Sequence, residues 1–226
     1  MFDLGIVWSA LPVLGRGAAV TLQLTALVIL FGTGLALPVA LCKNARRPAL
    51  RAAAGAYVMF FRGTPSLVQV FLLYYGSSQF EVIQKSVLWP VLRDPFWCVV
   101  IALGLNSASY TGKTLASALA AVPAGLRDAA FSLGLSRPVA FWTVELPLAV
   151  RTALPAFSNE VILTCQATSL ASTVTLLDLT GTARLLTSET YAPYEVFISA
   201  GLVYLAINYS LMLGLRRLEI RLVRTH

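Results

Sequence analysis

Residues 17–42 read GAAVTLQLTALVILFGTGLALPVALC and contain no Asp, Glu, Lys or Arg. A helix needs about 20 apolar residues to cross the hydrocarbon core of a bilayer, so this stretch is long enough to span a membrane. Further stretches without a charged residue cover 63–80, 95–112, 161–177 and 196–215. These runs are continuously apolar and do not alternate, which favours membrane helices over a transmembrane β-barrel.

The composition of the whole chain agrees with a membrane protein. Of its 226 residues, 58% are hydrophobic and 12% are charged, whereas soluble domains carry about 25% charged residues. We therefore predict an all-α, polytopic helical bundle in which residues 1–226 form one transmembrane domain. Five spans are expected at about 17–42, 56–79, 95–117, 147–170 and 195–215, with external segments at 80–94 and 171–193.

The positions of the basic residues predict the orientation of the chain. The net charge is +7, and most Lys and Arg residues follow the first, third and fifth spans, as Lys43, Arg127 and Arg216 do. Loops rich in Lys and Arg stay in the cytoplasm. We therefore expect the N-terminus outside and the C-terminus inside a cell inner membrane, with lipid rather than nucleic acid around the chain.

Two local patterns lie within the predicted spans. Thr64 is a favourable N-cap and Pro65 a favourable first helical residue, so a break or kink is predicted there. Cys42, Cys98 and Cys165 lie singly among apolar residues and show no metal-ligand spacing. We interpret these cysteines as small packing residues.

The segment between the third and fourth spans is the most informative one. Residues 122–147 read VPAGLRDAAFSLGLSRPVAFWTVELP. This pattern predicts two short helices joined at Gly134, which can supply a positive φ. Ser136 with Pro138 two residues later is typical of a helix start, and Pro147 is expected to mark the turn into span four.

The same segment resembles the EAA loop of ABC importer permeases. The resemblance rests on Asp128, Ala129 and Ala130, on Gly134 after three further residues, and on Leu146-Pro147 at the end of the loop. It implies a coupling helix that docks into a groove of an ATPase subunit. Asp128 stands where Glu is usual, which keeps the charge. The alternative is a generic helix–turn–helix linker.

Further motifs narrow the resemblance to permeases of polar amino acids. Residues 61–69, FRGTPSLVQ, look like the R-G-T-P-x-x-x-Q stretch of that family, and 105–110, LNSASY, match its L-N-x-A-x-Y stretch. Residues 158–163, SNEVIL, and 168–172, TSLAS, are similar to the M-type subunits for basic amino acids (histidine, arginine, lysine, ornithine) or opines (octopine, nopaline).

The family resemblance implies a type I ABC importer permease fold and a set of partners. These are a second permease subunit that is expected to be a paralogue and to form a heterodimer with this chain, two ATPase subunits that hold ATP and Mg²⁺, and an external solute-binding protein. No cofactor is expected on this chain. Gly112-Lys113-Thr114 is similar to the end of a phosphate-binding loop, but the Gly required at 107 is Ser107. The chain is therefore predicted to transport and not to hydrolyse ATP.

Glu160 is the first candidate for substrate binding. It lies inside span four beside Asn159 and shortly after Pro155, which frees the carbonyl of Arg151. A carboxylate at the bilayer centre costs about 2.5–3.5 kcal/mol, so Glu160 should face a cavity or a partner. The hypothesis is that Glu160 pairs with a substrate ammonium or guanidinium group. The alternative is that it bridges helices at a subunit interface.

Gln69, Asn106, Ser109 and Tyr110 are secondary candidates for substrate binding. Helical spacing puts Asn106, Ser109 and Tyr110 on one face of span three. The alternative for these side chains is hydrogen bonding between helices, which is common in membrane bundles.

Two departures from the family pattern leave the substrate open. Lys113 occupies a position that is often Glu, and Gln166 one that is often Lys. Because Lys113 weakens the case for a path tuned only for cations, opines remain an alternative to basic amino acids. A secondary transporter driven by an ion gradient is a further alternative, although such proteins usually have more spans and repeat symmetry.

Overall fold

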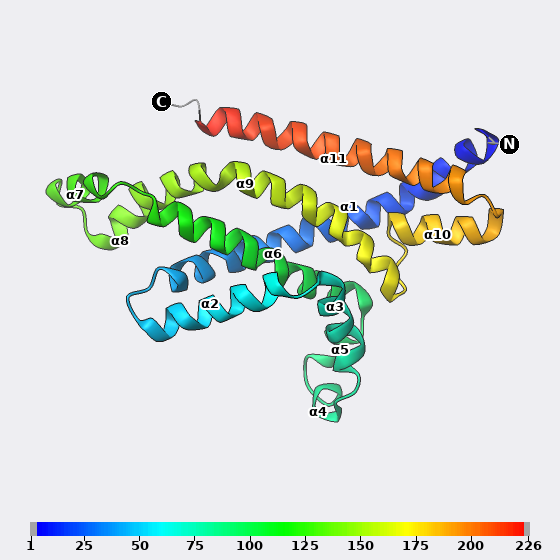
Figure 1. Ribbon diagram of the computed structural model, residues 1–226, viewed down its shortest axis with the longest axis horizontal. Coiled ribbons are helices and arrows are strands. Elements are labelled where there is room, and N and C mark those ends of the chain that lie inside the picture. Colours follow the sequence, from blue (N-terminus) through cyan, green and yellow to red (C-terminus); the bar gives the residue numbers. More distant parts are fainter. Residues whose placement is uncertain (1–3, 224–226) are drawn as a thin grey trace.

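The computed structural model describes residues 4–223, and in this range it contains helices, turns and no β-strand. Figure 1 shows a bundle of long helices that run roughly along one axis. The helices are α1 Leu4–Lys43, α2 Pro48–Gly63, α3 Ser66–Phe71, α4 Glu81–Gln84, α5 Trp89–Leu92, α6 Pro95–Ala120, α7 Ala124–Ser132, α8 Arg137–Ala140, α9 Leu146–Ala167, α10 Leu179–Thr190 and α11 Pro193–Val223. The all-α prediction is confirmed.

Helix α6 is the centre of the bundle. It packs along α1 and also contacts α9, α2 and α3. Glycines permit the close approach of α1 and α6, because a Cβ on Gly104 would collide with the Phe31 ring and one on Gly112 would come 2.7 Å from Val39 Cγ1. Small residues serve the same purpose at many helix contacts inside membranes.

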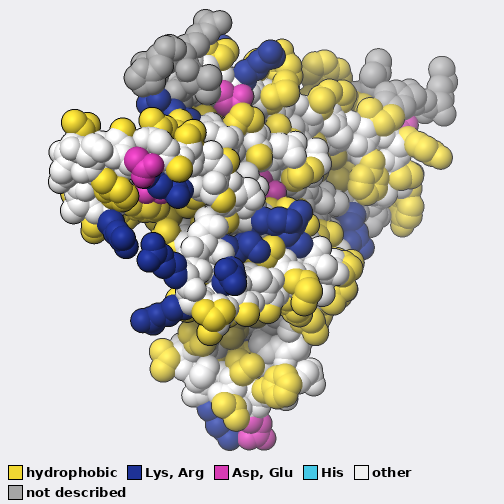
Figure 2. Space-filling view, turned by 60° about the vertical axis from the view of Figure 1, so that its left-hand side comes forward, with side chains coloured by type: hydrophobic (Ala, Val, Ile, Leu, Met, Phe, Trp, Pro, Cys, Tyr) yellow, Lys and Arg dark blue, Asp and Glu magenta, His cyan; other side chains and the backbone are white. Residues whose placement is uncertain are grey.

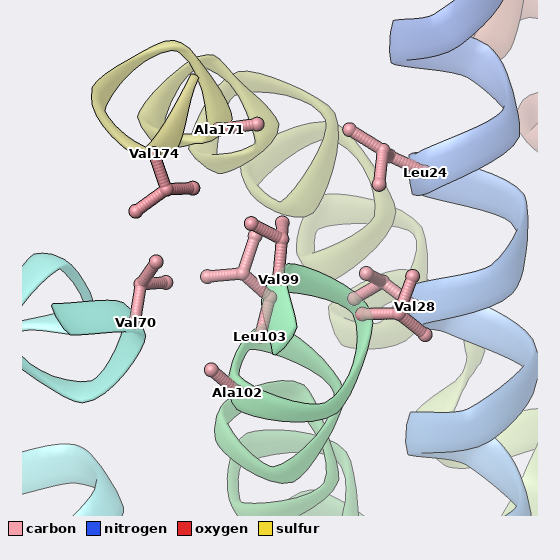
Figure 3. Packing of buried hydrophobic residues seen from close by; sticks show 9 residues of the cluster. Leu24, Val28, Val70, Val99, Ala102, Leu103, Ala171 and Val174 are labelled. Atoms are coloured by element: carbon pink, nitrogen blue, oxygen red, sulfur yellow. The ribbon is translucent and has the colours of Figure 1, made fainter. Parts of the chain in front are cut away.

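The main hydrophobic core lies between α1, α6 and the segments around two breaks. Figure 3 shows Leu24 and Val28 of α1 facing Val99 of α6, with Val70 of α3 and Val174 on the other side. All five side chains have essentially no exposed surface. Two further clusters join α1 to the start of α9 and to α10 and α11.

Two helices, α1 and α11, are each long and apolar enough to cross a membrane. Two bent pairs also qualify: Pro48–Gly63 with Ser66–Gly76, bent by 104°, and Arg137–Val174 with Leu179–Thr190, bent by 48°. The predicted count of five spans therefore depends on including α6, which is less apolar than these four segments. Because α6 is surrounded by other helices, it can carry polar residues such as Asn106 that a lipid-facing helix would exclude.

The predicted break in span two is present, but its register differs. Thr64 ends α2 and donates its hydroxyl to the Phe60 carbonyl at 2.8 Å, and Pro65 is the N-cap of α3 rather than its first residue. Helix α2 also begins at Pro48, earlier than the start of about 56 that was predicted for span two.

Two other local predictions are wrong. The chain does not turn at Pro147, because α8, the π-helical turn Phe141–Glu145 and α9 continue one another. The π-helical turn ends two residues before Pro147, whose ring nitrogen cannot donate a hydrogen bond. The external segment 171–193, for which no helix was predicted, contains the end of the 3₁₀ helix Thr168–Val174 and the whole of α10.

Candidate functional site

A cavity of about 630 Å³ lies between α1, α6 and α9. Most of its wall is apolar, with side chains such as Leu37, Leu115 and Phe157. Asn159 and Glu160 of α9 and Tyr110 of α6 add polar groups. A largely apolar cavity with a few polar groups is the usual form of a small-molecule site.

A second cavity of about 200 Å³ lies beside the first, on the side of α3. Ser66, Asn106 and Ser107 line only this smaller cavity, whereas Tyr110 and Glu160 line both. Tyr110 and Glu160 therefore form part of the partition between the two cavities. A solute that passed from one to the other would move past a carboxylate and a phenol.

A cation lies close to this partition. The guanidinium carbon of Arg62, in the last turn of α2, is 4.6 Å from the centroid of the Tyr110 ring, within the range of a cation–π contact. Glu160 is partly buried, lines the smaller cavity together with Ser107, and is close enough to Arg62 for the two charges to interact. The site thus combines one negative and one positive group around an aromatic ring.

Sequence reasoning did not select Arg62 or Ser107 as site residues. A signal for Arg62 was available, because a charged residue within or beside a span usually faces a cavity or a partner. Ser107 carries no such signal, since serine is common in packed membrane helices.

Gln69 and Asn106 are brought together at the break between α2 and α3. Asn106 Nδ2 donates to Gln69 Oε1 at 3.0 Å and to the Phe61 carbonyl at 2.9 Å. Gln69 Nε2 donates to the same carbonyl at 2.9 Å and to Thr64 Oγ1 at 2.7 Å. These bonds satisfy backbone groups that the broken helix leaves without a helical partner.

The remaining predicted positions lie apart from the two cavities. The Ser109 side chain is fully buried and donates to the Asn106 carbonyl at 2.7 Å. Lys113 and Gln166 are exposed and line neither cavity. Of the six predicted substrate contacts, Glu160, Asn159 and Tyr110 line the large cavity, Asn106 lines only the small one, and Gln69 and Ser109 line neither.

Helices α7 and α8 form a hairpin at one end of the bundle (Figure 1). Asp128 and Ala129 are exposed on α7, whereas Ala130 is buried. Gly134 has φ +79°, as predicted, and two backbone bonds close the turn: Leu135 N to Ala130 O at 3.1 Å and Gly134 N to Phe131 O at 2.9 Å. This pattern is a Schellman C-cap.

One side chain of α7 makes two polar contacts with the bundle. Arg127 Nε lies 2.9 Å from Glu145 Oε2 in an ion pair, and Arg127 Nη2 donates to the Leu119 carbonyl at the end of α6 at 3.1 Å. From Arg137 to Val174 the chain is helical without interruption. The hairpin and Glu160 are therefore linked through one continuous helical segment.

Comparisons with known proteins agree with this architecture. Residues 18–224 match the family model described as the binding-protein-dependent transport system inner membrane component. The octopine transport system permease protein OccM of Rhizobium meliloti is 44% identical over 208 residues, which cover 92% of this chain and 85% of that protein. The arginine ABC transporter permease protein ArtM of Escherichia coli (strain K12) is 39% identical over 210 residues, covering 92% and 94%.

A solved structure has the same fold over nearly the whole chain. It is described as the crystal structure of an amino acid ABC transporter with histidines, and it superposes with a TM-score of 0.85 at 30% sequence identity. The match covers 98% of this chain and 99% of that chain.

Proposed function

The chain belongs to the family of binding-protein-dependent transport system inner membrane components, and from that premise we propose that it is the permease subunit of an ATP-driven importer for polar, basic amino acids. The named relatives that support this substrate class are the arginine and octopine permeases. The work of such a subunit is vectorial, since it moves a solute without changing its bonds.

The observation that carries the substrate proposal is the position of Glu160 in the walls of both cavities. A substrate ammonium or guanidinium group would pair with this carboxylate, and Asn159 and Tyr110 would offer hydrogen bonds beside it. Charge-assisted hydrogen bonds of this kind contribute about 1.5–3 kcal/mol each. The apolar wall of the large cavity would hold the aliphatic part of the side chain.

Arg62 could bind the α-carboxylate of the amino acid whose cationic group pairs with Glu160. Its guanidinium stacks on Tyr110 near Glu160. Every amino acid carries an α-carboxylate, and a fixed cation at the partition would attract it. Together, Arg62 and Glu160 match a solute that has charges of both signs.

Opines are the second candidate substrate class. They carry more carboxylates than simple amino acids, and the OccM relative at 44% identity is an octopine permease. Because Arg62 adds a cation, the site accommodates an additional carboxylate better than it would with Glu160 as its sole charged group.

The coupling proposal rests on the α7–α8 hairpin. Asp128 and Ala129 are exposed there, beside the exposed apolar side chains of Leu126 and Leu133. We propose that this surface docks into a groove of an ATPase subunit, and that Gly134 forms the turn that presents it. Movement of the hairpin would reach Glu160 through the helical segment that begins at Arg137.

The remaining partners follow from the same assignment. A second permease subunit, a paralogue or a second copy, would complete the path through the membrane, and an external solute-binding protein would deliver the amino acid. The positive-inside rule puts the hairpin in the cytoplasm, with the N-terminus outside. ATP and Mg²⁺ would bind on the ATPase subunits.

Glu160→Gln tests the substrate contact. The variant keeps the shape of the side chain and removes its charge. We expect the assembled permease–ATPase complex, without the solute-binding protein, to bind arginine about 10- to 100-fold more weakly, because one charge-assisted hydrogen bond is lost. Equilibrium dialysis with labelled arginine and octopine measures both affinities.

Glu189→Gln is the matched control, because Glu189 is an exposed carboxylate on α10 that lines neither cavity. Its affinity for arginine should equal that of the parent. If Glu160→Gln left both affinities unchanged and lowered the melting temperature instead, Glu160 would be a bridge between helices or subunits.

A further inference from the structure

A third cavity, of about 610 Å³, lies at the base of the hairpin and is separate from the proposed substrate path. It is lined by the ends of α1 and α6, by α7, α8 and the π-helical turn Phe141–Glu145, and by the turn between α1 and α2. We refer to it as the basic cavity, because Arg46, Arg127 and Arg137 line it together with a single carboxylate, Glu145.

The charges of the basic cavity are not balanced. Glu145 is already paired with Arg127 at 2.9 Å. Within residues 4–223, no carboxylate forms an ion pair with Arg46 or Arg137. Two cations from different segments therefore face one concave surface, and Figure 2 shows a row of Lys and Arg side chains with few acidic ones on this side of the molecule. Such an arrangement attracts an anion.

The rest of the lining indicates what kind of anion fits. Leu41, Leu119, Phe131 and Phe141 supply apolar surface next to the arginines. A small inorganic anion would leave these apolar side chains uncovered, whereas an amphipathic molecule would cover both the basic and the apolar parts of the lining. The basic cavity suits a ligand with a charged end and an apolar body.

The level of the basic cavity along the bundle points to the same ligand. Leu41 belongs to the last turn of the charge-free stretch 17–42, and Lys43 and Arg46 follow within the next four residues. The cavity thus lies where apolar helix gives way to basic residues, which is the level of phospholipid headgroups. Basic pockets between membrane helices at this level bind anionic headgroups.

We propose that the basic cavity binds the headgroup of an anionic phospholipid, with Arg46 and Arg137 on its phosphate and the apolar wall against its glycerol and upper acyl carbons. The bound lipid bridges the turn between α1 and α2 to α8. It thereby holds the hairpin against the bundle, which makes the position of the hairpin sensitive to the lipid composition of the membrane.

The test uses the complete complex of permease and ATPase subunits in detergent. Short-chain phosphatidylglycerol is titrated and its retention is followed by native mass spectrometry. Near a membrane surface each basic residue contributes about 1 kcal/mol to the attraction of an anionic lipid. We therefore expect the Arg46→Gln/Arg137→Gln variant to raise the apparent Kd about 30-fold, and Arg46→Gln alone to raise it about 5-fold.

Arg47→Gln/Arg51→Gln is the matched control. It removes the same charge from neighbouring, exposed positions that do not line the basic cavity. Its Kd for phosphatidylglycerol should stay within about 2-fold of the parent value. If the double variant at Arg46 and Arg137 failed to assemble, the single Arg46→Gln variant, at an exposed position in a turn, would decide the question.

Four results would overturn the proposal. An equal loss in the control variant would indicate general surface attraction. Equal affinity for phosphatidylcholine would show that the net negative charge of the lipid is not required. Equal affinity for glycerol phosphate would show that the ligand is a soluble phosphate and not a lipid. Absence of binding to the complete complex, with binding to the permease alone, would show that the ATPase subunits cover the basic cavity.

Discussion

Replacing Gly134 by Ala is expected to weaken the α7–α8 hairpin through the backbone alone. Gly134 has φ +79°, and a Cβ built on it would have no heavy atom within 4 Å. The substitution therefore creates no steric overlap with neighbours. An L-residue in the left-handed region costs about 1–2 kcal/mol relative to glycine, so this is the expected loss of local stability.

The loss should appear in the two backbone bonds that close the turn. A change of 1–2 kcal/mol alters an opening equilibrium about 5- to 30-fold. Hydrogen–deuterium exchange of the Gly134 and Leu135 amides, which donate to Phe131 and Ala130, should accelerate by this factor. Peptides from α6 should keep the parent rates, because the hairpin adds little to the core around Val99.

Gly125→Ala is a matched substitution in the same hairpin. Gly125 is in the first turn of α7, has no positive φ, and likewise has no heavy atom within 4 Å of a built Cβ. Alanine is favoured over glycine in a helix by about 0.5–1 kcal/mol, so exchange in α7 should slow slightly. The reasoning would be refuted if Gly134→Ala exchanged no faster than the parent, or if both substitutions shifted exchange in the same direction.

Two further predictions concern the bundle itself. Asn106→Leu should lower the free energy of unfolding by about 1–2 kcal/mol, because it leaves Gln69 Oε1 without its 3.0 Å donor. Thermal unfolding in detergent measures this loss, and an unchanged melting temperature would contradict the role of Asn106 at the break. Gly17→Ala should destabilise by about 1–3 kcal/mol, because its Cβ would lie 2.5 Å from Thr182 Oγ1 and 2.9 Å from a backbone oxygen of α10's N-cap. Gly15→Ala, in the same helix with free space around the Cβ, is the control and should be neutral or stabilising; equal effects of the two alanines would refute the packing argument.

Part of the candidate site could be predicted because single residues restrict the backbone or the environment on their own. Gly134 was recognised as a turn because glycine reaches positive φ without strain. Glu160 was recognised as a cavity residue because a carboxylate is costly to expose to lipid. Neither argument needs knowledge of the neighbouring helices.

Other parts could not be predicted because they depend on which helices meet. Asn106 and Ser109 share one helical face in the sequence pattern, yet one bonds across the break to Gln69 and the other only to its own helix. Arg62 belongs to a different helix from Tyr110, and only packing brings the guanidinium to 4.6 Å from the ring. The helix α10 was missed because its polar residues resemble a loop when its packing against α1 is unknown.

The amino-acid sequence by itself determined that this chain is a bundle of apolar helices with a basic side and a hairpin turning at Gly134. These features follow from the transfer of side chains between water and lipid and from local backbone sterics, which act on each segment separately. Only the tertiary structure decided that Glu160 and Tyr110 share two cavities, that Arg62 lies beside them, and that the hairpin is pinned through Arg127 to Glu145. Such contacts depend on the angles and close approaches of whole helices, which a linear pattern of residues does not contain.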